Sequence, residues 1–313
     1  MKKWALWTAL GAAVAFTTIG AAAAHEDGEP VAQLAHELDS ALEHEHGEGF
    51  DTKHVFGFTE GTDNGHAGER EMELETTIRA AKLGGGRYGA VEQEAVYESI
   101  VTDRFGYEAS LHGLWMTSHG VPGLENRSGS AFSGFSVAPK FILLKRGVDS
   151  PIGLAVSIAP EWDRIDPIGG GHASNYVVPI RLMADVELIH DKLYGAANLL
   201  YAPEWDSFSG LGNAQNALLS LSGALAYRAA PKISIGGQIE YINAYTSTGL
   251  RDWAGWGFYI GPAMSWKVSH NIFVKATWAA QIAGKQATTG GLAAYDAADL
   301  SRQRANLLLG VEF

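Results

Sequence analysis

The chain has 313 residues, a formal net charge of −12 at pH 7 and no Cys. Its length suffices for one large domain or two ordinary ones. The negative charge argues against nucleic acid as a partner, and a chain without Cys suits export to an oxidising compartment because it forms no stray disulfides.

The first 24 residues have the pattern of a secretory signal peptide. Lys2 and Lys3 form a basic start, residues 4–20 are mostly apolar, and residues 21–24 are small residues suited to cleavage. A membrane anchor is the alternative, but the apolar run is short. Beyond residue 24 no stretch of about 18 apolar residues follows, so no transmembrane helix is expected. A soluble periplasmic protein and a β-barrel remain as classes.

Residues 25–66 are predicted to form a separate acidic, His-rich segment in the periplasm. Between Pro30 and His44 apolar residues recur at helical spacing, which predicts a short amphipathic helix. Six of the eleven His residues precede residue 67. With neighbouring carboxylates they could hold Zn²⁺ or Cu²⁺, although their spacing matches no closed site. The candidate ligands are His36, His44 and His46, and a solvated linker is the alternative.

From residue 67 to residue 313 apolar and polar residues alternate with a period of two, which is typical of β-strands with two different faces. About twelve such strands follow one another, and after the first turn short and long connections alternate. This pattern predicts an all-β fold, an antiparallel up-and-down transmembrane barrel. A soluble β-sandwich is the alternative. Trp115, Trp205 and Trp266 lie near expected strand ends, which favours the barrel because aromatic girdles mark membrane interfaces.

The polar face of a transmembrane barrel lines its interior, and here that face is strongly charged. The first three strands carry an acidic wall, formed by Glu69, Glu71, Glu73, Glu75, Glu92, Glu94, Glu98 and Glu108. Closure of the barrel would bring Arg302 and Arg304 of the last strand beside this wall. The opposite side is expected to hold Lys140, Arg146 and Arg181 near Glu161, Asp185 and Glu187.

These interior charges have two interpretations. They could select cations by focusing a negative field, or they could form salt bridges that brace the wall. A barrel of about twelve strands is narrower than an open porin, so any channel should also be narrow.

One short motif occurs twice, as residues 159–163 and again as residues 202–206, both reading Ala-Pro-Glu-Trp-Asp. Each copy is expected at the extracellular end of a strand, with Trp towards lipid and the two carboxylates inward. The motif could be an architectural repeat of the girdle and rim. It could also form a cation site at the mouth, with Glu161, Asp163, Glu204 and Asp206 as ligands.

No catalytic motif stands out, and we expect neither an enzyme nor a cofactor. Outer-membrane hydrolases use Ser/His or Asp/His groups near the membrane boundary. The one inward Ser/His pair on a predicted strand is Ser110 with His112, and it lacks a recognisable motif.

The last twelve residues, Arg302 to Phe313, alternate as a strand, with Leu308 as the one misfit, and end on an aromatic residue. This segment resembles the closing strand of Gram-negative outer-membrane β-barrels. The resemblance implies that Phe313 belongs to the signal read by the barrel assembly machinery, and that the protein lies among the lipids of the cell outer membrane.

A narrower resemblance runs from about residue 56 to the end. Residues 56–63, Gly68 with Glu69, the turn Val101–Arg104 and the Pro-Glu-Trp pattern resemble a family of uncharacterised proteobacterial outer-membrane proteins. That family is distantly similar to proteins proposed to accompany aromatic-compound degradation. The expected function is a narrow, porin-like passive channel for small solutes or cations. The alternatives are a structural or metal-associated envelope protein with a plugged lumen and, less favoured, an outer-membrane hydrolase.

Overall fold

The computed structural model describes residues 51–82, 85–147, 150–208, 212–287 and 300–313. The predicted signal peptide, the helix between Pro30 and His44, and the ligands His36, His44 and His46 lie outside these residues. The compact unit that contains the barrel begins at Glu48. Residues 51–66 therefore belong with the barrel and not with the separate periplasmic segment that their composition suggests.

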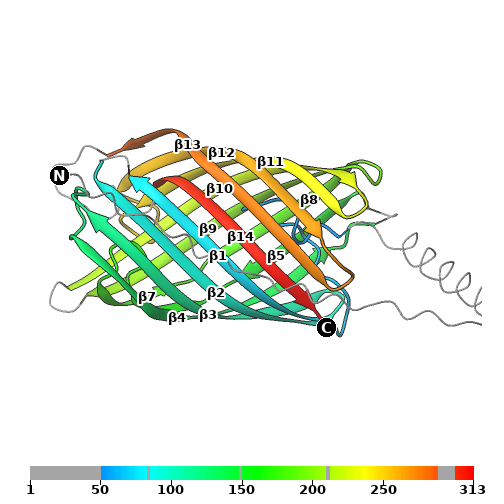
Figure 1. The fold of residues 1–313 in the computed structure, drawn as a ribbon, viewed down its shortest axis with the longest axis horizontal. Coiled ribbons are helices and arrows are strands. Elements are labelled where there is room, and N and C mark those ends of the chain that lie inside the picture. Colours follow the sequence, from blue (N-terminus) through cyan, green and yellow to red (C-terminus); the bar gives the residue numbers. More distant parts are fainter. Residues whose placement is uncertain (1–50, 83–84, 148–149, 209–211, 288–299) are drawn as a thin grey trace, which may run out of the picture. The chain divides into compact units, whose positions relative to one another are not determined.

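The described chain is an antiparallel sheet that closes on itself, because its last strand pairs with its first (Figure 1). Its strands are β1 (Arg70–Lys82), β2 (Arg87–Thr102), β3 (Phe105–His119), β4 (Arg127–Leu144), β5 (Ile152–Ile158), β6 (Glu161–Ile165), β7 (His172–Val177), β8 (Ile180–Ile189), β9 (Leu193–Phe208), β10 (Gly212–Ala230), β11 (Ile233–Tyr245), β12 (Trp253–Lys267), β13 (Ile272–Gln286) and β14 (Ser301–Glu312).

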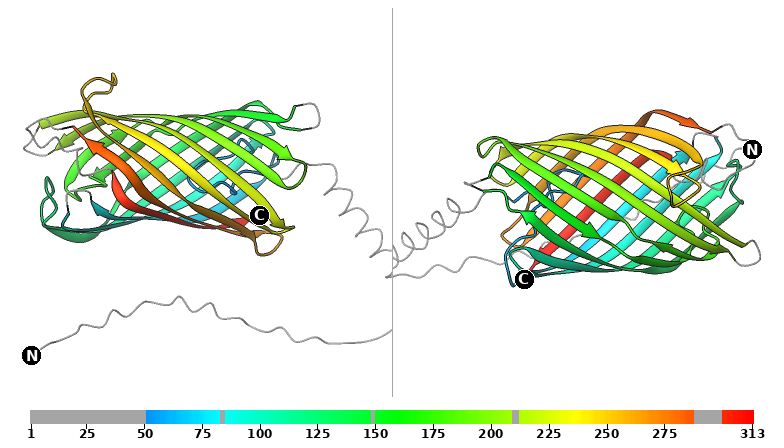
Figure 2. Two further views of the ribbon diagram at one scale, coloured as in Figure 1. Left: turned by 90° about the horizontal axis from the view of Figure 1, so that it is seen from above. Right: turned by 180° about the vertical axis from the view of Figure 1, so that it is seen from behind.

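Four of these strands are halves of two barrel strands. Both β5 and β6 pair with β4, and both β7 and β8 pair with β9, so the barrel has twelve strands, as the sequence predicts. The strands run obliquely around it (Figure 2). Both interruptions fall at proline, at Pro160 and Pro179, which lack a backbone N–H for the ladder.

Proline carbonyl groups keep the sheet connected at these interruptions. Those of Pro160, Pro179 and Pro203 each accept a hydrogen bond from the adjacent strand, at N···O distances of 2.8–3.1 Å. Proline therefore breaks the regular ladder here without opening the barrel wall.

The two faces of the wall differ as the period of two predicts. On β3, Leu111 is 59% exposed, whereas its neighbour His112 is 2% exposed. Large exposed apolar side chains occur on strands around the whole outer surface. Such a continuous apolar surface is unfavourable in water, and it suits the hydrocarbon of a bilayer. Among the described residues, none forms a helix with the length and apolarity needed to cross a membrane.

Leu308 departs from the alternation of the last strand because it is an apolar residue on the inner face. Leu308 on β14 points inward and is 2% exposed, although its neighbours on that face are polar. Phe313 is exposed, and its backbone N–H bonds the carbonyl of Arg70, so the C-terminus lies at the start of β1. The proposed role of Phe313 in insertion stays a prediction.

Candidate functional site in the barrel interior

Residues 51–66, which we call the luminal segment, lie inside the barrel. Val55 and Phe56 are buried and pack with Tyr194 of β9 and with two alanines of β10. Further along, Phe58 packs against a second interior cluster that includes Tyr259. These apolar contacts fix the segment to the walls formed by β9 to β12.

Lys53 anchors the luminal segment to the acidic wall. Its ammonium nitrogen lies 2.8 Å from Glu71 Oε2 and forms a second ion pair with Glu98. All three side chains are buried. Because a buried carboxylate is costly unless it is paired, Lys53 offsets part of the cost of burying these two members of the wall.

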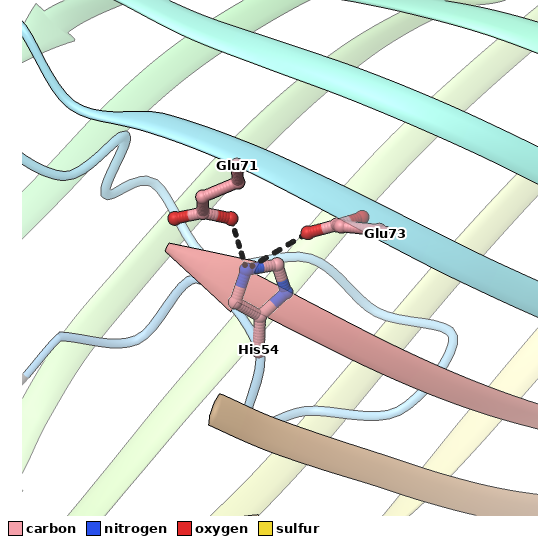
Figure 3. A group of neighbouring side chains, drawn as sticks. All are labelled: His54, Glu71 and Glu73. Atoms are coloured by element: carbon pink, nitrogen blue, oxygen red, sulfur yellow. Dashed lines mark ion pairs between the residues drawn. The ribbon is translucent and has the colours of Figure 1, made fainter. Parts of the chain in front are cut away.

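His54 meets the same wall one residue later. Its Nε2 atom lies 3.4 Å from Glu71 Oε2 and 3.3 Å from Glu73 Oε1 (Figure 3). The ring stacks on Phe273 of β13, with a centroid distance of 4.3 Å. Burial and, after it, the charge of Lys53 lower the pKa of His54 to about 3. The imidazole is therefore neutral at neutral pH, and the positive charge at this wall comes from Lys53.

Both ends of the luminal segment also contact the wall opposite the acidic one. Arg146 contacts Asp63 at 2.6 Å and Asp185 of β8 at 3.2 Å. The hydroxyl of Thr52 also donates to Asp185, at 2.5 Å. The expected proximity of Arg146 to Asp185 is present, and the luminal segment supplies a further carboxylate to it.

Lys140 and Arg181 face the lumen, as the sequence predicts, and both bind the luminal segment. Lys140 donates to the backbone carbonyls of Gly61 and Asp63, at 3.1 and 2.7 Å. Arg181 forms an ion pair with Glu60. Neither was expected to have a partner in the segment, because the polar residues 51–66 were assigned to the periplasm.

Amide side chains complete the attachment midway along the segment. Gln238 of β11 accepts from the backbone N–H of Phe58 at 2.7 Å. Asn198 of β9 accepts from the N–H of Glu60 at 2.7 Å and donates to its carbonyl at 2.9 Å. With the ionic contacts to β1, β2, β4 and β8, the segment is attached to walls on several sides of the barrel and crosses its interior.

The arginines of the last strand do not join the acidic wall. Arg304 pairs with Glu240 of β11 at 2.6 Å and lies over the ring of Phe58, 4.5 Å from its centroid. Arg302 is exposed. Arg79 lies directly opposite Arg304 on β1, and two like charges in register repel each other. Arg304 therefore reaches inward and across to β11.

The acidic wall is only partly neutralised. Arg79 pairs with Glu92 at 3.0 Å, and Asn306 donates to Glu75. Glu69 precedes β1 and accepts from the backbone of the segment's end. Within the described residues, no Lys or Arg lies in ion-pair distance of the remaining members, Glu94 and Glu108. These two carboxyl groups of the interior therefore have no ion-pair partner among the Lys and Arg residues of the described chain.

The loop between β6 and β7 folds over part of the other mouth. Its carbonyls at Pro167, Ile168 and Gly170 accept from Arg79, Tyr88 and Arg127, which belong to β1, β2 and β4, at 3.0–3.2 Å. Both ends of the lumen thus carry a segment that narrows it.

The two Ala-Pro-Glu-Trp-Asp motifs reach different partners. Glu161 Oε1 and Asp163 Oδ1 lie 3.7 and 3.4 Å from Nδ1 of His112. In the second motif, Glu204 and Asp206 instead accept from Asn175, and Asp206 also accepts from Asn216. The motifs are neighbours, but the structure divides the expected four-carboxylate set into two differently bonded pairs.

His112 also has a different serine from the expected one. Its Nε2 atom lies 3.3 Å from Oγ of Ser136 on β4, and Ser110 is not its hydrogen-bond partner among the described residues. Residues two apart on a strand share a face but are about 7 Å apart. The adjacent strand therefore supplies the closer hydroxyl.

Sequence reasoning missed the luminal segment and, with it, Lys53, His54 and Asp63. The available signal was weak. Phe56 and Phe58 are large apolar residues in a polar stretch, and the likeness to an outer-membrane family already begins at residue 56. Neither signal says whether such a stretch lies inside the barrel or beside it.

Comparison with known proteins supports the fold. Residues 48–313 match the model of a "Family of unknown function (DUF6662)", and no curated protein matches the chain. The COG4313 outer membrane channel from Pseudomonas putida F1 is similar, with a TM-score of 0.57, 11% identity, and coverage of 80% of this chain and 98% of that chain.

Two porin structures are also similar to this chain. One is the KdgM porin in complex with disordered oligogalacturonate, with a TM-score of 0.46 and 11% identity over 78% of this chain and 99% of that one. The other is the NanC porin, with a TM-score of 0.45 and 9% identity over 77% and 98%. The fold argument rests on the first of the three structures, and at 11% identity that likeness concerns the fold alone, that of an outer-membrane β-barrel.

Proposed function

This chain belongs to a family of unknown function (DUF6662), and from its own geometry we propose that it is an outer-membrane channel for small solutes in which the luminal segment limits passage. The observation that carries the proposal is the attachment of this segment across the interior by ion pairs and amide hydrogen bonds. The end that holds the segment and Phe313 faces the periplasm in this proposal.

The contacts of the luminal segment are of a kind that lets the segment leave the lumen. Most of them are polar, as at Lys53, Glu60 and Asp63, so water can replace them when the segment moves. The wall behind the segment also carries polar side chains on its inner face, among them Asn198 and Gln238. A hydrated passage is therefore compatible with the wall once the segment shifts.

A reversible crosslink tests the proposal in one folded protein. An ideal Cβ at Gly153 of β5 would lie 3.1 Å from Cβ of Thr62. A disulfide joins Cβ atoms about 3.5–4.5 Å apart, so the bond needs a small shift that also moves the Asp185 carboxylate, whose Oδ1 lies 2.5 Å from the same ideal Cβ. The chain has no Cys of its own. We expect the Thr62→Cys/Gly153→Cys variant to conduct poorly in planar bilayers when oxidised and better after reduction.

The two single-Cys variants are the matched controls, and reductant should not change their conductance. Removal of residues 51–64 should raise conductance further. If neither reduction nor the deletion gives any conductance while the barrel is folded, the protein is a plugged structural barrel and not a channel.

Cations are the preferred solutes in this proposal. Glu94 and Glu108 face the interior with no Lys or Arg in ion-pair distance among the described residues, and Glu75 is half-buried beside them. A surplus of carboxylates in a narrow, low-dielectric passage enriches cations. The Glu75→Gln/Glu94→Gln/Glu108→Gln variant should lose cation preference in reversal-potential measurements. Liposome swelling would show which small solutes pass.

A further inference from the structure

We propose that His112, Glu161 and Asp163 form a binding site for a first-row divalent cation such as Zn²⁺, independent of whether the barrel conducts. Each of the three side chains offers one donor atom, and these atoms lie within 4.8 Å of one another. One imidazole and two carboxylates are a ligand set that suits Zn²⁺ and similar ions.

A glycine brings these side chains together from strands that are not neighbours. His112 is on β3, Asp163 is on β6, and β4 runs between them with Gly134 in register with both. A Cβ at Gly134 would lie 2.2 Å from Asp163 Oδ1 and 1.9 Å from the Trp162 carbonyl. Only a residue without a side chain leaves room for the imidazole and the carboxylate to meet over the middle strand.

The distances fit coordination around one ion. His112 Nδ1 lies 3.4 Å from the Asp163 oxygen and 3.7 Å from the Glu161 oxygen. Tetrahedral ligands at about 2.1 Å from a metal are about 3.4 Å from each other. The three donors therefore need only small shifts to bind an ion between them.

Buried polar atoms without hydrogen bonds gather at this place. His112 is 2% exposed and Asp163 is fully buried, yet Nδ1 of the histidine and Oδ2 of the aspartate have no hydrogen-bond partner. The same holds for Oδ1 of buried Asn175, whose residue is in register with Asp163. An unsatisfied buried carboxylate oxygen is costly, and a cation would satisfy it.

The charge at the site also favours a cation. Among the described residues, His112 is the one basic side chain in ion-pair distance of Glu161 or Asp163. Glu94 adds a third carboxylate, 3.8 Å from His112 Nε2. One imidazole faces three carboxyl groups here, and a divalent ion beside a neutral histidine offers them more positive charge than a single proton does.

The surrounding hydroxyl groups hold the ligands in place. Ser133 donates to Asp163 Oδ1 at 2.8 Å, and Ser136 lies beside the other ring nitrogen of His112. Such outer contacts orient metal ligands. The series Ser136, His112, Asp163 also resembles a hydrolase triad. However, Ser136 lies within β4 between two paired strands, so its neighbouring N–H groups serve the ladder and are not free to form an oxyanion hole.

The test measures Zn²⁺ binding to the folded protein, residues 25–313, in detergent, by competition with a chromophoric chelator. His36, His44 and His46 are replaced by Asn in every sample, so that this His-rich stretch adds no competing site. His112→Gln and Asp163→Asn should each weaken binding by at least about tenfold. His54→Gln and His190→Gln are the controls, because they change the other two His–carboxylate groups, and they should leave the affinity unchanged.

A folded barrel is verified for each variant by its heat-modifiable migration in gels. Glu161→Gln serves as a second variant, read from the visible absorption of bound Co²⁺, which should change in intensity. No Zn²⁺ binding by the starting protein overturns the proposal, and so does unchanged affinity in the His112 and Asp163 variants. Ester hydrolysis that Ser136→Ala abolishes would assign His112 to a hydrolase instead.

Discussion

The interior holds two buried His–carboxylate clusters that differ in the source of their positive charge. Around His54, Lys53 pairs with Glu71 and Glu98, so a cation of the protein itself balances the carboxylates. Around His112, no Lys or Arg of the described chain reaches Glu161 or Asp163. The first cluster joins the luminal segment to the wall, whereas the second lies within the wall, and each leaves buried polar atoms without a hydrogen bond.

The difference indicates how geometry alone can mislead. Both clusters place an imidazole nitrogen 3.3–3.7 Å from two carboxylates, and either could be taken for a metal site. The ammonium group of Lys53 distinguishes the two clusters, because a metal ion bound beside it would be repelled by a positive charge at close range. The four predictions that follow test this contrast in order of decreasing effect.

Lys53→Met should have the largest effect on stability. It leaves Glu71 and Glu98 buried without their cation, and breaking a buried ion pair on one side costs about 3–5 kcal/mol. Urea unfolding followed by Trp fluorescence measures the loss. Lys232→Met, at an exposed position, is the control. Equal midpoints for the two variants would contradict the role of Lys53 as the counter-charge.

Zn²⁺ should stabilise the protein through the second cluster. At a free concentration of about 100 times the dissociation constant, one site adds about 2.7 kcal/mol to the free energy of unfolding. The shift should persist in Lys232→Met and vanish in Asp163→Asn. A shift of the same size in Asp163→Asn would place the ion elsewhere.

His54→Leu should lower the free energy of unfolding by less than Lys53→Met does. The change removes the stacking on Phe273, which is about 0.5–1.5 kcal/mol for an aromatic pair, and keeps an apolar side chain in its place. His66→Leu is the control because His66 is exposed. The luminal segment should be cut faster by protease in the His54 variant, and an unchanged cleavage rate would argue against a docking role.

When Zn²⁺ is removed by a chelator, Asp163→Asn should have the smallest effect of the four on the free energy of unfolding. It keeps an acceptor for Ser133 and relieves repulsion among buried carboxylates, so the free energy of unfolding should change by no more than about 1 kcal/mol, towards stabilisation. A loss of several kcal/mol without metal would mean that the carboxylate is already balanced within the protein, as at Lys53.

Much of the barrel could be predicted from local pattern. Alternation such as Leu111 outward and His112 inward depends only on the two-residue repeat of a strand, so it can be read from neighbours in the chain. Even the interruption at Pro160 follows from a missing N–H. The acidic members of β1 to β3 that face inward were found in the same way.

The partners inside the barrel could not be predicted, because they depend on three-dimensional closure. Arg304 is beside β1 in the ladder, but it binds Glu240 of β11, since side chains can reach across the lumen. Lys140 binds backbone carbonyls of a stretch more than seventy residues earlier, which no periodicity encodes. The pairing of His112 with Asp163 over β4 needs the register of three strands at once.

By itself, the sequence determined a twelve-strand barrel and the faces on which its charges lie, because each is a short-range regularity of the chain. Only the tertiary structure decided that residues 51–66 lie within the lumen and which carboxylates receive a cation from the protein. The reason is physical: a charge inside a closed wall is balanced by whichever group is near in space, and spatial proximity there is set by curvature and register.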